Sequence, residues 1–487
     1  SRPEINIRPV DGILVAHNDD LFGWRGPNPP NFEAASWHFG WRKNYDPFSS
    51  DNLPTAPDTI VNYTQRRYLW IDSWLIKNFN IDPKRIQIQG HSMGSAGVLA
   101  LTKCYPEHYA SGTIFNTGCG GPEPGGMLAL FGDVTQNFPT NLKNRAGETV
   151  HQVSLWNMLD NCSPERDFPP IRHWHGKSDD NGTMRWDAYV VENYRKADSI
   201  GLGFQNMWSE RGHAWGDIPT INDHWANGIQ PNLQTALDDV VFAESRFRSD
   251  QSFPAFFNHR LDQNNNDPGT GLIGINNGDG DNWGAWGGYH RWGKNSTVDQ
   301  AGEWSVVAWL ESNAVFPNDN CPDDQLRADL AIRKPQSFKP TTGQMLNWNV
   351  KDVDTGILLQ NGTTTVQDED LVVIPQVIVY REDIRRVRIS VTDPSVPVFE
   401  PGLVFSEMKI EPNPSLGNAV LSVFSPVDME AKISASSLDG KHLAVNVDLL
   451  EGQNRLSLAS FEPLPAGFYF ITISTNKFKQ VVKWVKI

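Results

Sequence analysis

One short stretch, Gly90-His91-Ser92-Met93-Gly94, constrains the chain around it more than any other. Residues 85–89 before it are typical of a short buried strand, and residues 96–101 after it are typical of a helix packed on that strand. A turn this sharp needs small residues two before and two after the serine, which Gly90 and Gly94 supply. We therefore predict that Ser92 is held out at the C-terminal edge of a sheet. The alternative is a chance match, since five-residue patterns recur often.

The predicted helix after Ser92 would point its N-terminus at the same place. That orientation puts the Met93 amide and the positive end of the helix dipole beside any oxyanion formed there. Met93 is therefore the candidate oxyanion donor.

A second helix is predicted just upstream, at 64–79, because apolar side chains recur there at helical spacing. They are Tyr68, Ile71, Leu75, Ile76 and Phe79. Pro83 disfavours helical geometry at Asp82 and so ends this segment.

This order of helix, Ile-Asp-Pro-Lys-Arg-Ile, strand and Gly-His-Ser-Met-Gly resembles the α/β-hydrolase superfamily over about residues 11–225. It looks most like secreted esterases related to feruloyl esterases and polyhydroxyalkanoate depolymerases, with prolyl-oligopeptidase-type peptidases as neighbours. The resemblance implies an α/β sheet and a catalytic serine, acid and histidine in that chain order.

The resemblance assigns the remaining two members of that triad. A strand ending in His175-Gly176 is followed by Asp179, the usual setting of the acid, and the loop after a strand at 204–208 carries His213, the base. His213 would take the proton of Ser92 and pass it to the leaving group, while Asp179 would fix the imidazole tautomer. The substitutes are Asp180 and, less well placed, Asp187 for the acid, and His224 for the base; His175 is expected to bond the loop that carries the acid.

Substrate contacts are expected from the long loop at 18–60, because long loops after sheet strands line the active-site face. It includes Ser36-Trp37-His38-Phe39-Gly40-Trp41, which resembles a loop of some secreted esterases. We assign Trp37, His38, Trp41 and His91 to substrate binding. Ordinary loop packing is the alternative for the loop residues.

The start of the sheet raises a further expectation. Residues 11–17 are typical of a buried strand, and no second strand is predicted between them and the helix at 64–79. In the family, the strand before that helix is the fourth, so the first three would lie upstream of Ser1. Otherwise residues 1–10 provide a shortened start. The second oxyanion donor of the family usually follows the third strand.

Composition limits the classes of partner and cofactor that the chain is expected to bind. A net charge of −15 over 487 residues argues against nucleic acid and anionic membranes, and no stretch of 18 apolar residues predicts a membrane span. No metal-ligand spacing is found among the four cysteines and no cofactor is implied. Cys119 and Cys162 could form a disulfide if the protein is exported.

The pattern changes from about residue 226, and a segment rich in Asn, Gly and Asp begins at 251, so we predict an α/β-hydrolase domain at 1–250 and a β-sandwich domain at 251–396. The strands expected in the second domain are 303–310, 329–332, 345–350, 371–378 and 386–391, and a helix is expected at 236–247 before it. Asn276–Asn282 fits a solvated turn better than a calcium loop, since the distal Glu is missing. Trp283, Trp286 and Trp292 fit either sugar stacking or core packing.

The last predicted domain, 404–487, is a small all-β sandwich. Its Pro412-Asn413-Pro414 opening, its Leu464-x-x-Gly467-x-Tyr469 strand and its Lys/Val-rich end resemble the C-terminal sorting domain of the bacterial type IX secretion system. A generic sugar-binding sandwich is the alternative. The resemblance implies a protein that is secreted by, or attached to the surface of, a Gram-negative bacterium, with the type IX machinery as partner.

The expected function is a secreted serine hydrolase that cleaves carboxylic esters on a polysaccharide or a polyester. A prolyl-oligopeptidase-type peptidase is the second candidate, although no β-propeller precedes Ser92. An inactive carbohydrate-binding or adhesion protein on a hydrolase scaffold is the third.

Overall fold

The computed structural model of the 487-residue chain describes a subset of its residues. These are residues 4–8, 12–17, 19, 36–45, 53–54, 56–117, 128–143, 147–156, 168–180, 185–210, 212–213, 247–259, 266–271, 279–313, 320–396, 406–416, 419–425, 429–437, 440–450, 452–474 and 479–487. Cys119, Cys162 and His224 lie outside them, as does the helix predicted at 236–247 apart from Phe247.

The chain forms two compact units, Ser1–Val396 and Pro397–Ile487. The boundary predicted at residue 250 falls inside the first unit. Residues 404–487 lie within the second unit.

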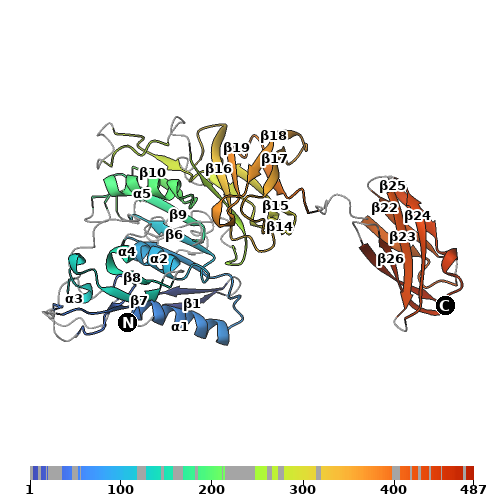
Figure 1. Ribbon diagram of the computed structural model, residues 1–487, viewed down its shortest axis with the longest axis horizontal. Coiled ribbons are helices and arrows are strands. Elements are labelled where there is room, and N and C mark those ends of the chain that lie inside the picture. The colour runs from blue at the N-terminus through green and yellow to red at the C-terminus, as the bar shows by residue number, and fades with distance from the viewer. Residues whose placement is uncertain are drawn as a thin grey trace. The chain divides into compact units, whose positions relative to one another are not determined.

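A five-stranded sheet organises the first unit, and Figure 1 labels three of its neighbouring strands, β6, β9 and β10. The strand directly before Ser92 is at one edge. The members of the sheet in spatial order are β12 (Gly284–Trp286), β10 (Gln205–Ser209), β9 (Ile171–Gly176), β6 (Ser111–Phe115) and β5 (Gln87–His91). β5, β6, β9 and β10 run parallel, whereas β12 pairs antiparallel with β10. The carboxyl ends of the four parallel strands therefore meet at one edge, where ligands of open α/β sheets bind.

Helices connect these parallel strands, as parallel pairing requires. Among the described residues these are α2 (Met93–Cys104) between β5 and β6, α3 (Leu128–Phe131) and α4 (Gln152–Trp156) between β6 and β9, and α5 (Ala188–Ser199) between β9 and β10. A further helix, α1 (Tyr63–Asn78), precedes β5. The helix predicted at 64–79 is confirmed within one residue at each end, and it buries Tyr68, Ile71 and Leu75 as the spacing indicated. α2 is buried over most of its length, because Val98, Leu99 and Ala100 pack against β6 and its neighbours.

The N-terminal strands differ from the prediction. The strand expected at 11–17 is present as β2 (Gly12–Ala16), but it pairs with β1 (Glu4–Arg8) in a sheet of their own. The prediction of no strand between it and α1 is wrong, because β3 (Trp41–Arg42) and β4 (Ile60–Val61) lie there. They form a separate sheet with β7 (Pro139–Lys143) and β8 (Thr149–His151) from later in the chain. Strands of two residues are too short to leave an alternating pattern in the sequence.

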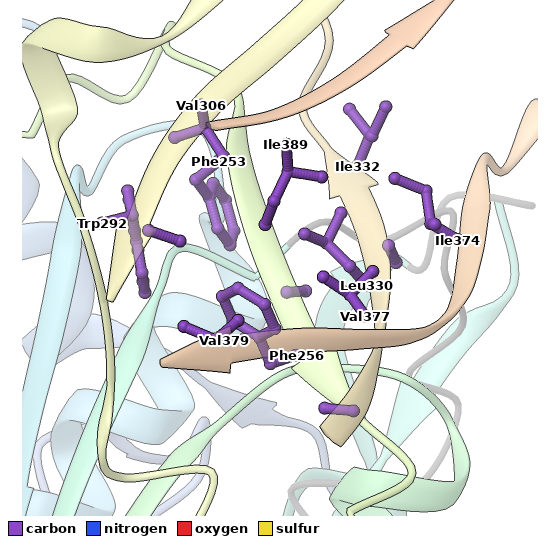
Figure 2. Close-up of a cluster of buried hydrophobic side chains, with 14 of the residues drawn as sticks. Phe253, Phe256, Trp292, Val306, Leu330, Ile332, Ile374, Val377, Val379 and Ile389 are labelled. Atoms are coloured by element: carbon purple, nitrogen blue, oxygen red, sulfur yellow. The ribbon is translucent and has the colours of Figure 1, made fainter. Parts of the chain in front are cut away.

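The described strands between Phe253 and Thr392, apart from β12, form two further sheets that face each other (Figure 2). One contains β11 (Phe253–Phe257), β16 (Gln325–Arg333) and β19 (Val373–Tyr380); the other contains β13 (His290–Trp292), β14 (Val298–Gln300), β15 (Glu303–Leu310), β17 (Met345–Asp352), β18 (Leu358–Thr365) and β20 (Val387–Thr392). Figure 2 shows Phe253 and Leu330 of the first sheet packed with Val306 and Ile389 of the second. Each strand predicted here is present, with ends shifted by a few residues.

The core of this sandwich continues onto the central sheet. Phe115, Trp174 and Met207 of the central sheet belong to the same buried cluster as Phe253 and Trp304. Trp286 and Trp292 are each 5% exposed and lie in hydrophobic cores, which favours core packing over sugar stacking for these two.

The second unit has two sheets around its own core. Its strands are β21 (Ser406–Glu411), β22 (Val420–Ser425), β23 (Met429–Ser437), β24 (His442–Leu449), β25 (Gly452–Ser457), β26 (Gly467–Ser474) and β27 (Lys479–Lys486). Trp484 of the last strand is fully buried, and its indole N–H donates to Ser415 Oγ (2.8 Å). Tyr469 packs beside it.

Across the described ranges, no helix is long and apolar enough to cross a membrane.

Candidate active site

Ser92 occupies a strained turn between β5 and α2. Its φ of 53° and ψ of −122° put a non-glycine residue in a sparsely populated region of backbone space. The Ser92 amide donates to Phe115 O (2.9 Å), and Ser95 Oγ donates to Gly90 O (2.6 Å) while it accepts from the Phe115 amide (2.9 Å). These bonds to β6 hold the turn in place, so the strain is maintained by the surrounding sheet.

The two glycines of the motif, Gly90 and Gly94, differ in how much space surrounds them. A Cβ added to Gly90 would lie 2.3 Å from the carbonyl carbon and oxygen of Gly94, so no side chain fits there. A Cβ added to Gly94 would have His38 Nε2 as its nearest neighbour, at 4.0 Å. The steric argument from the sequence therefore holds for Gly90 and is wrong for Gly94.

Ser92, His213 and Asp179 lie in mutual reach. His213 Nε2 is 2.9 Å from Ser92 Oγ, and His213 Nδ1 is 2.8 Å from Asp179 Oδ2. An ionised carboxylate only accepts hydrogen bonds, so Nδ1 carries the proton and Nε2 accepts from the serine hydroxyl. The Asp179 side chain is fully buried and that of His213 is 17% exposed, so the imidazole lies between a shielded carboxylate and the hydroxyl of the partly buried Ser92.

The backbone of His213 is fixed by two side chains from neighbouring strands. His91 Nε2 donates to His213 O (2.7 Å), and Asn116 Nδ2 donates to Gly212 O (3.0 Å) and His213 O (2.9 Å). Asn116 Oδ1 also accepts from the amide of Gly176, at the end of the strand that precedes Asp179 (3.0 Å). Asn116 therefore ties the loop of the base to the strand of the acid.

Sequence reasoning missed Asn116 and did not foresee that His91 bonds the backbone of His213; its assignment to substrate binding stays a prediction. A signal for Asn116 was available, since it is a polar residue directly after a fully buried strand lying between those of Ser92 and Asp179. The described contact of His91 is with His213 rather than with an open surface. Burial lowers the pKa of His91 to about 4, so its imidazole is neutral at pH 7 and Nε2–H is its donor.

Met93 is the first residue of α2, directly after Ser92. The first amides of a helix have no acceptor in the preceding turn and lie at the positive end of the dipole. The position predicted for an oxyanion donor is therefore next to the serine.

The residues expected in a substrate wall lie close to the start of α2. His38 Nδ1 is 2.8 Å from Tyr68 OH, and Gly97 leaves room for its ring, since a Cβ there would be 2.5 Å from His38 Cβ. Trp37 and Trp41 are partly buried against a core that includes side chains of α2, and the ring centroids of Trp41 and Tyr63 are 4.7 Å apart. The structure thus places the His38 side chain beside Gly94 and Gly97, in the first half of α2, and gives both tryptophans packing contacts.

The two alternative acids, Asp187 and Asp180, are placed elsewhere, and the alternative base His224 lies outside the described residues. The carboxylate of Asp187 caps α5 by accepting from the amides of Tyr189 (2.8 Å) and Val190 (3.3 Å), and Asp180 is exposed. His175, expected to bond the loop of the acid, has its Nε2 3.8 Å from Asp179 Oδ2. No group of three His, Cys, Asp or Glu residues suited to a metal ion occurs among the residues that the structure describes.

Comparisons with known proteins give only remote likenesses. No protein-family model matches the chain, and no curated protein matches it. Solved structures that are similar in part include an S-formylglutathione hydrolase from Agrobacterium tumefaciens, with 16% identity and a TM-score of 0.31 over 45% of this chain and 72% of that chain. A tetra-tandem repeat from the extending region of a large adhesion protein has 11% identity and a TM-score of 0.17 over 39% of this chain and 57% of that chain. A β-glucuronidase from Parabacteroides merdae has 11% identity and a TM-score of 0.12 over 39% and 28%. At these scores none of the three bears on the chemistry of the site.

Proposed function

We propose that the chain is a serine hydrolase of the α/β-hydrolase type that cleaves carboxylic esters through an acyl-enzyme. The observation that carries the proposal is the line of contacts from Ser92 Oγ to His213 Nε2 (2.9 Å) and from His213 Nδ1 to Asp179 Oδ2 (2.8 Å). A hydroxyl, an imidazole and a carboxylate in this order are the parts that make serine nucleophilic at neutral pH.

Each step assigns a proton to a stated atom. Ser92 Oγ attacks the ester carbonyl carbon while His213 Nε2 takes the hydroxyl proton, and Asp179 stabilises the imidazolium that results. The negative oxygen of the tetrahedral intermediate lies at the Met93 amide. The imidazolium returns the proton to the alcohol oxygen as the C–O bond breaks. Water then attacks the acyl-enzyme with His213 again as the base, which releases the acid and restores Ser92.

The topology supports the same assignment. Ser92, Asp179 and His213 follow β5, β9 and β10, whose carboxyl ends lie at one edge of a parallel sheet. The strained φ of 53° at Ser92 is the kind of backbone feature that persists where a site over-determines it. For the substrate we propose acyl esters of a polysaccharide, or a polyester, since the sequence most resembles esterases of these classes.

Hydrolysis of p-nitrophenyl acetate tests this proposal. Ser92→Ala is expected to lower kcat at least ~10³-fold, while Ser73→Ala, which removes an exposed hydroxyl on α1 bonded to Leu69 O, leaves it unchanged. Faster cleavage of a peptide anilide than of the ester would favour the peptidase. A wild-type protein without either activity would favour the inactive scaffold.

For the second unit we propose a sorting role in type IX secretion, and hence a product outside the cell of a Gram-negative bacterium. The support is the sequence resemblance together with the separate compact unit at Pro397–Ile487. In a bacterium with this system, the full chain is expected in the medium or on the surface, and a chain ending at residue 396 is expected to stay in the periplasm. Equal export of both chains would contradict the proposal.

A further inference from the structure

A loop of the β-rich segment contacts the two loops that carry Asp179 and His213. Lys177 Nζ donates to Asp279 O (2.8 Å) and Asp281 O (2.9 Å), and it lies two residues before Asp179. Trp208 Nε1, in the strand before His213, donates to the same Asp281 O (3.0 Å). One carbonyl of residues 279–282 thus receives bonds from both sides of the site.

A third bond adds to these two. Asn282 Nδ2 donates to Glu210 Oε1 (3.1 Å), three residues before His213. Immediately afterwards β12 pairs with β10, with Gly284 opposite Trp208 and Ala285 opposite Met207. The segment 279–286 therefore lies along the end of β10 and reaches Glu210, the residue directly after that strand.

The Lys177 side chain that makes these bonds is buried. Lys177 is 1% exposed, its ammonium lies over the ring of Trp186 (5.6 Å), and the carboxylates of Asp267, Asp279 and Asp281 surround it with favourable charge. A buried ammonium is costly unless it is paired and hydrogen-bonded, which this arrangement achieves.

The loop that accepts these bonds is itself braced. The Asp281 amide donates to Asp267 O (2.7 Å), and Asp281 Oδ2 accepts from the Asp267 amide (3.0 Å). Asp279 Oδ2 accepts from the amide (2.8 Å) and the hydroxyl (2.6 Å) of Thr270. Because its own hydrogen bonds hold this loop in one conformation, it can fix the positions of Lys177 and Trp208, which bond to it.

We infer that residues 279–286 are a positioning element for the catalytic acid and base, with Lys177 and Trp208 as positioning residues. The inference rests on the function proposed above and gives the β-rich segment a role in it. Productive geometry at such sites is demanding, since a misplacement of 1 Å can cost about 100-fold in rate. Loss of these bonds leaves Ser92 intact and lets Asp179 and His213 drift from it.

The first test compares Lys177→Met with Lys334→Met. Lys334 is also buried, and its Nζ also joins the β-rich segment to the N-terminal part, through Pro106 O (2.8 Å), but at the end of α2 away from Ser92. At equal distance below each melting temperature, Lys177→Met is expected to lower kcat for p-nitrophenyl acetate at least ~10-fold with little change in KM. Lys334→Met is expected to stay within about twofold of wild type. Equal kcat values for the two variants would overturn the inference.

A milder pair guards against failure to fold. Trp208→Phe removes one indole N–H bond to Asp281, and Trp304→Phe removes the matching bond from the sandwich core to Ser252 Oγ (3.0 Å). Only the first is expected to lower kcat. Lys177→Met and Trp208→Phe combined are expected to cost less than the product of their separate effects, because both act through Asp281 O. Full multiplicativity would contradict a shared element.

Amide hydrogen exchange separates this inference from the proposed function. In Lys177→Met, exchange at 177–180 and 210–213 is expected to quicken, whereas in Lys334→Met it is expected to match wild type there. Unchanged exchange overturns the positioning role even in an active enzyme. If wild type neither hydrolyses esters nor reacts with a fluorophosphonate, the proposed function fails while the exchange result still decides whether the element holds these loops.

Discussion

The ring of His175 lies against the carboxylate of Asp179, with Nε2 3.8 Å from Oδ2. The same oxygen is 2.8 Å from His213 Nδ1, so two imidazoles converge on one carboxylate oxygen. Behind it, His175 Nδ1 is 3.4 Å from His173 Nε2, and both of these rings are buried. Burial lowers the pKa of His173 to about 4, which makes it neutral at pH 7. Asp179 Oδ2 thus has the rings of His213 and His175 beside it, and His173 packs behind His175.

Replacing His175 is therefore expected to act through Asp179. His175→Gln shortens the group that encloses the carboxylate, and we predict a kcat for p-nitrophenyl acetate lowered by about 10-fold with KM unchanged. His259→Gln is the control, since this buried histidine of the sandwich bonds Phe256 O (3.2 Å) and has no contact with Asp179 among the described interactions. If both variants lost stability but kept the wild-type kcat, His175 would have no role in positioning Asp179.

Asn116 is expected to matter through the three backbone groups that it bonds. Asn116→Ala leaves the carbonyls of Gly212 and His213 with fewer donors, and we predict a kcat lowered by about 10- to 100-fold. Asn258→Ala is a matched control, because Asn258 also follows a strand with a left-handed φ (52°, against 51° for Asn116) but bonds Asp329 in the sandwich. Equal kcat values in steady-state assays of the two variants would contradict the role of Asn116.

The turn at Ser92 predicts different outcomes at its two glycines. Gly90→Ala puts a methyl group 2.3 Å from the Gly94 backbone, and we expect the free energy of unfolding to fall by about 3 kcal/mol or more. Gly94→Ala meets nothing closer than 4.0 Å and is expected to be near neutral. Urea unfolding of both variants measures the difference, and equal midpoints would show that the turn is not as tight as described.

The partly buried histidine before Ser92, His91, makes stability depend on pH. The pKa of His91 is about 4 in the folded chain, because burial outweighs the bond to His213 O, against 6.5 when unfolded. The unfolded chain therefore binds the extra proton between these values, and stability is lost as pH falls from 6.5 to 4. His91→Gln keeps a donor for His213 O and is expected to reduce the slope of unfolding free energy by up to about 1.4 kcal/mol per pH unit.

The control for that slope is His151→Gln, which changes an exposed histidine. It is expected to leave the pH dependence of unfolding as it is in wild type. A slope unaltered by His91→Gln would mean that His91 is not held neutral by the fold.

The residues around Ser92 were predictable because their pattern is local. The glycines, the strand and the helix lie within about twenty residues. α1 was predictable because apolar side chains recur on one of its faces at helical spacing. The order of Asp179 and His213 after strand ends could also be anticipated, because the resemblance supplied it. The bonds of Asn116 and Lys177 could not, since they join residues up to 104 positions apart and leave no periodic trace.

The sheet boundaries illustrate the same limit. β12 comes from a segment that composition assigns to another domain, yet it pairs with β10, because an open sheet edge can accept any strand that the tertiary fold delivers. β3 and β4 are two residues each, too short for alternation to reveal them.

Reaction with a fluorophosphonate tests the central claim most directly. A serine activated by His213 and Asp179 is expected to be phosphonylated once per chain, and peptide mapping by mass spectrometry is expected to place the adduct on Ser92. His213→Gln is expected to abolish the labelling while the fold is retained. An unlabelled wild-type protein, or an adduct on another residue that persists in Ser92→Ala, would contradict the account.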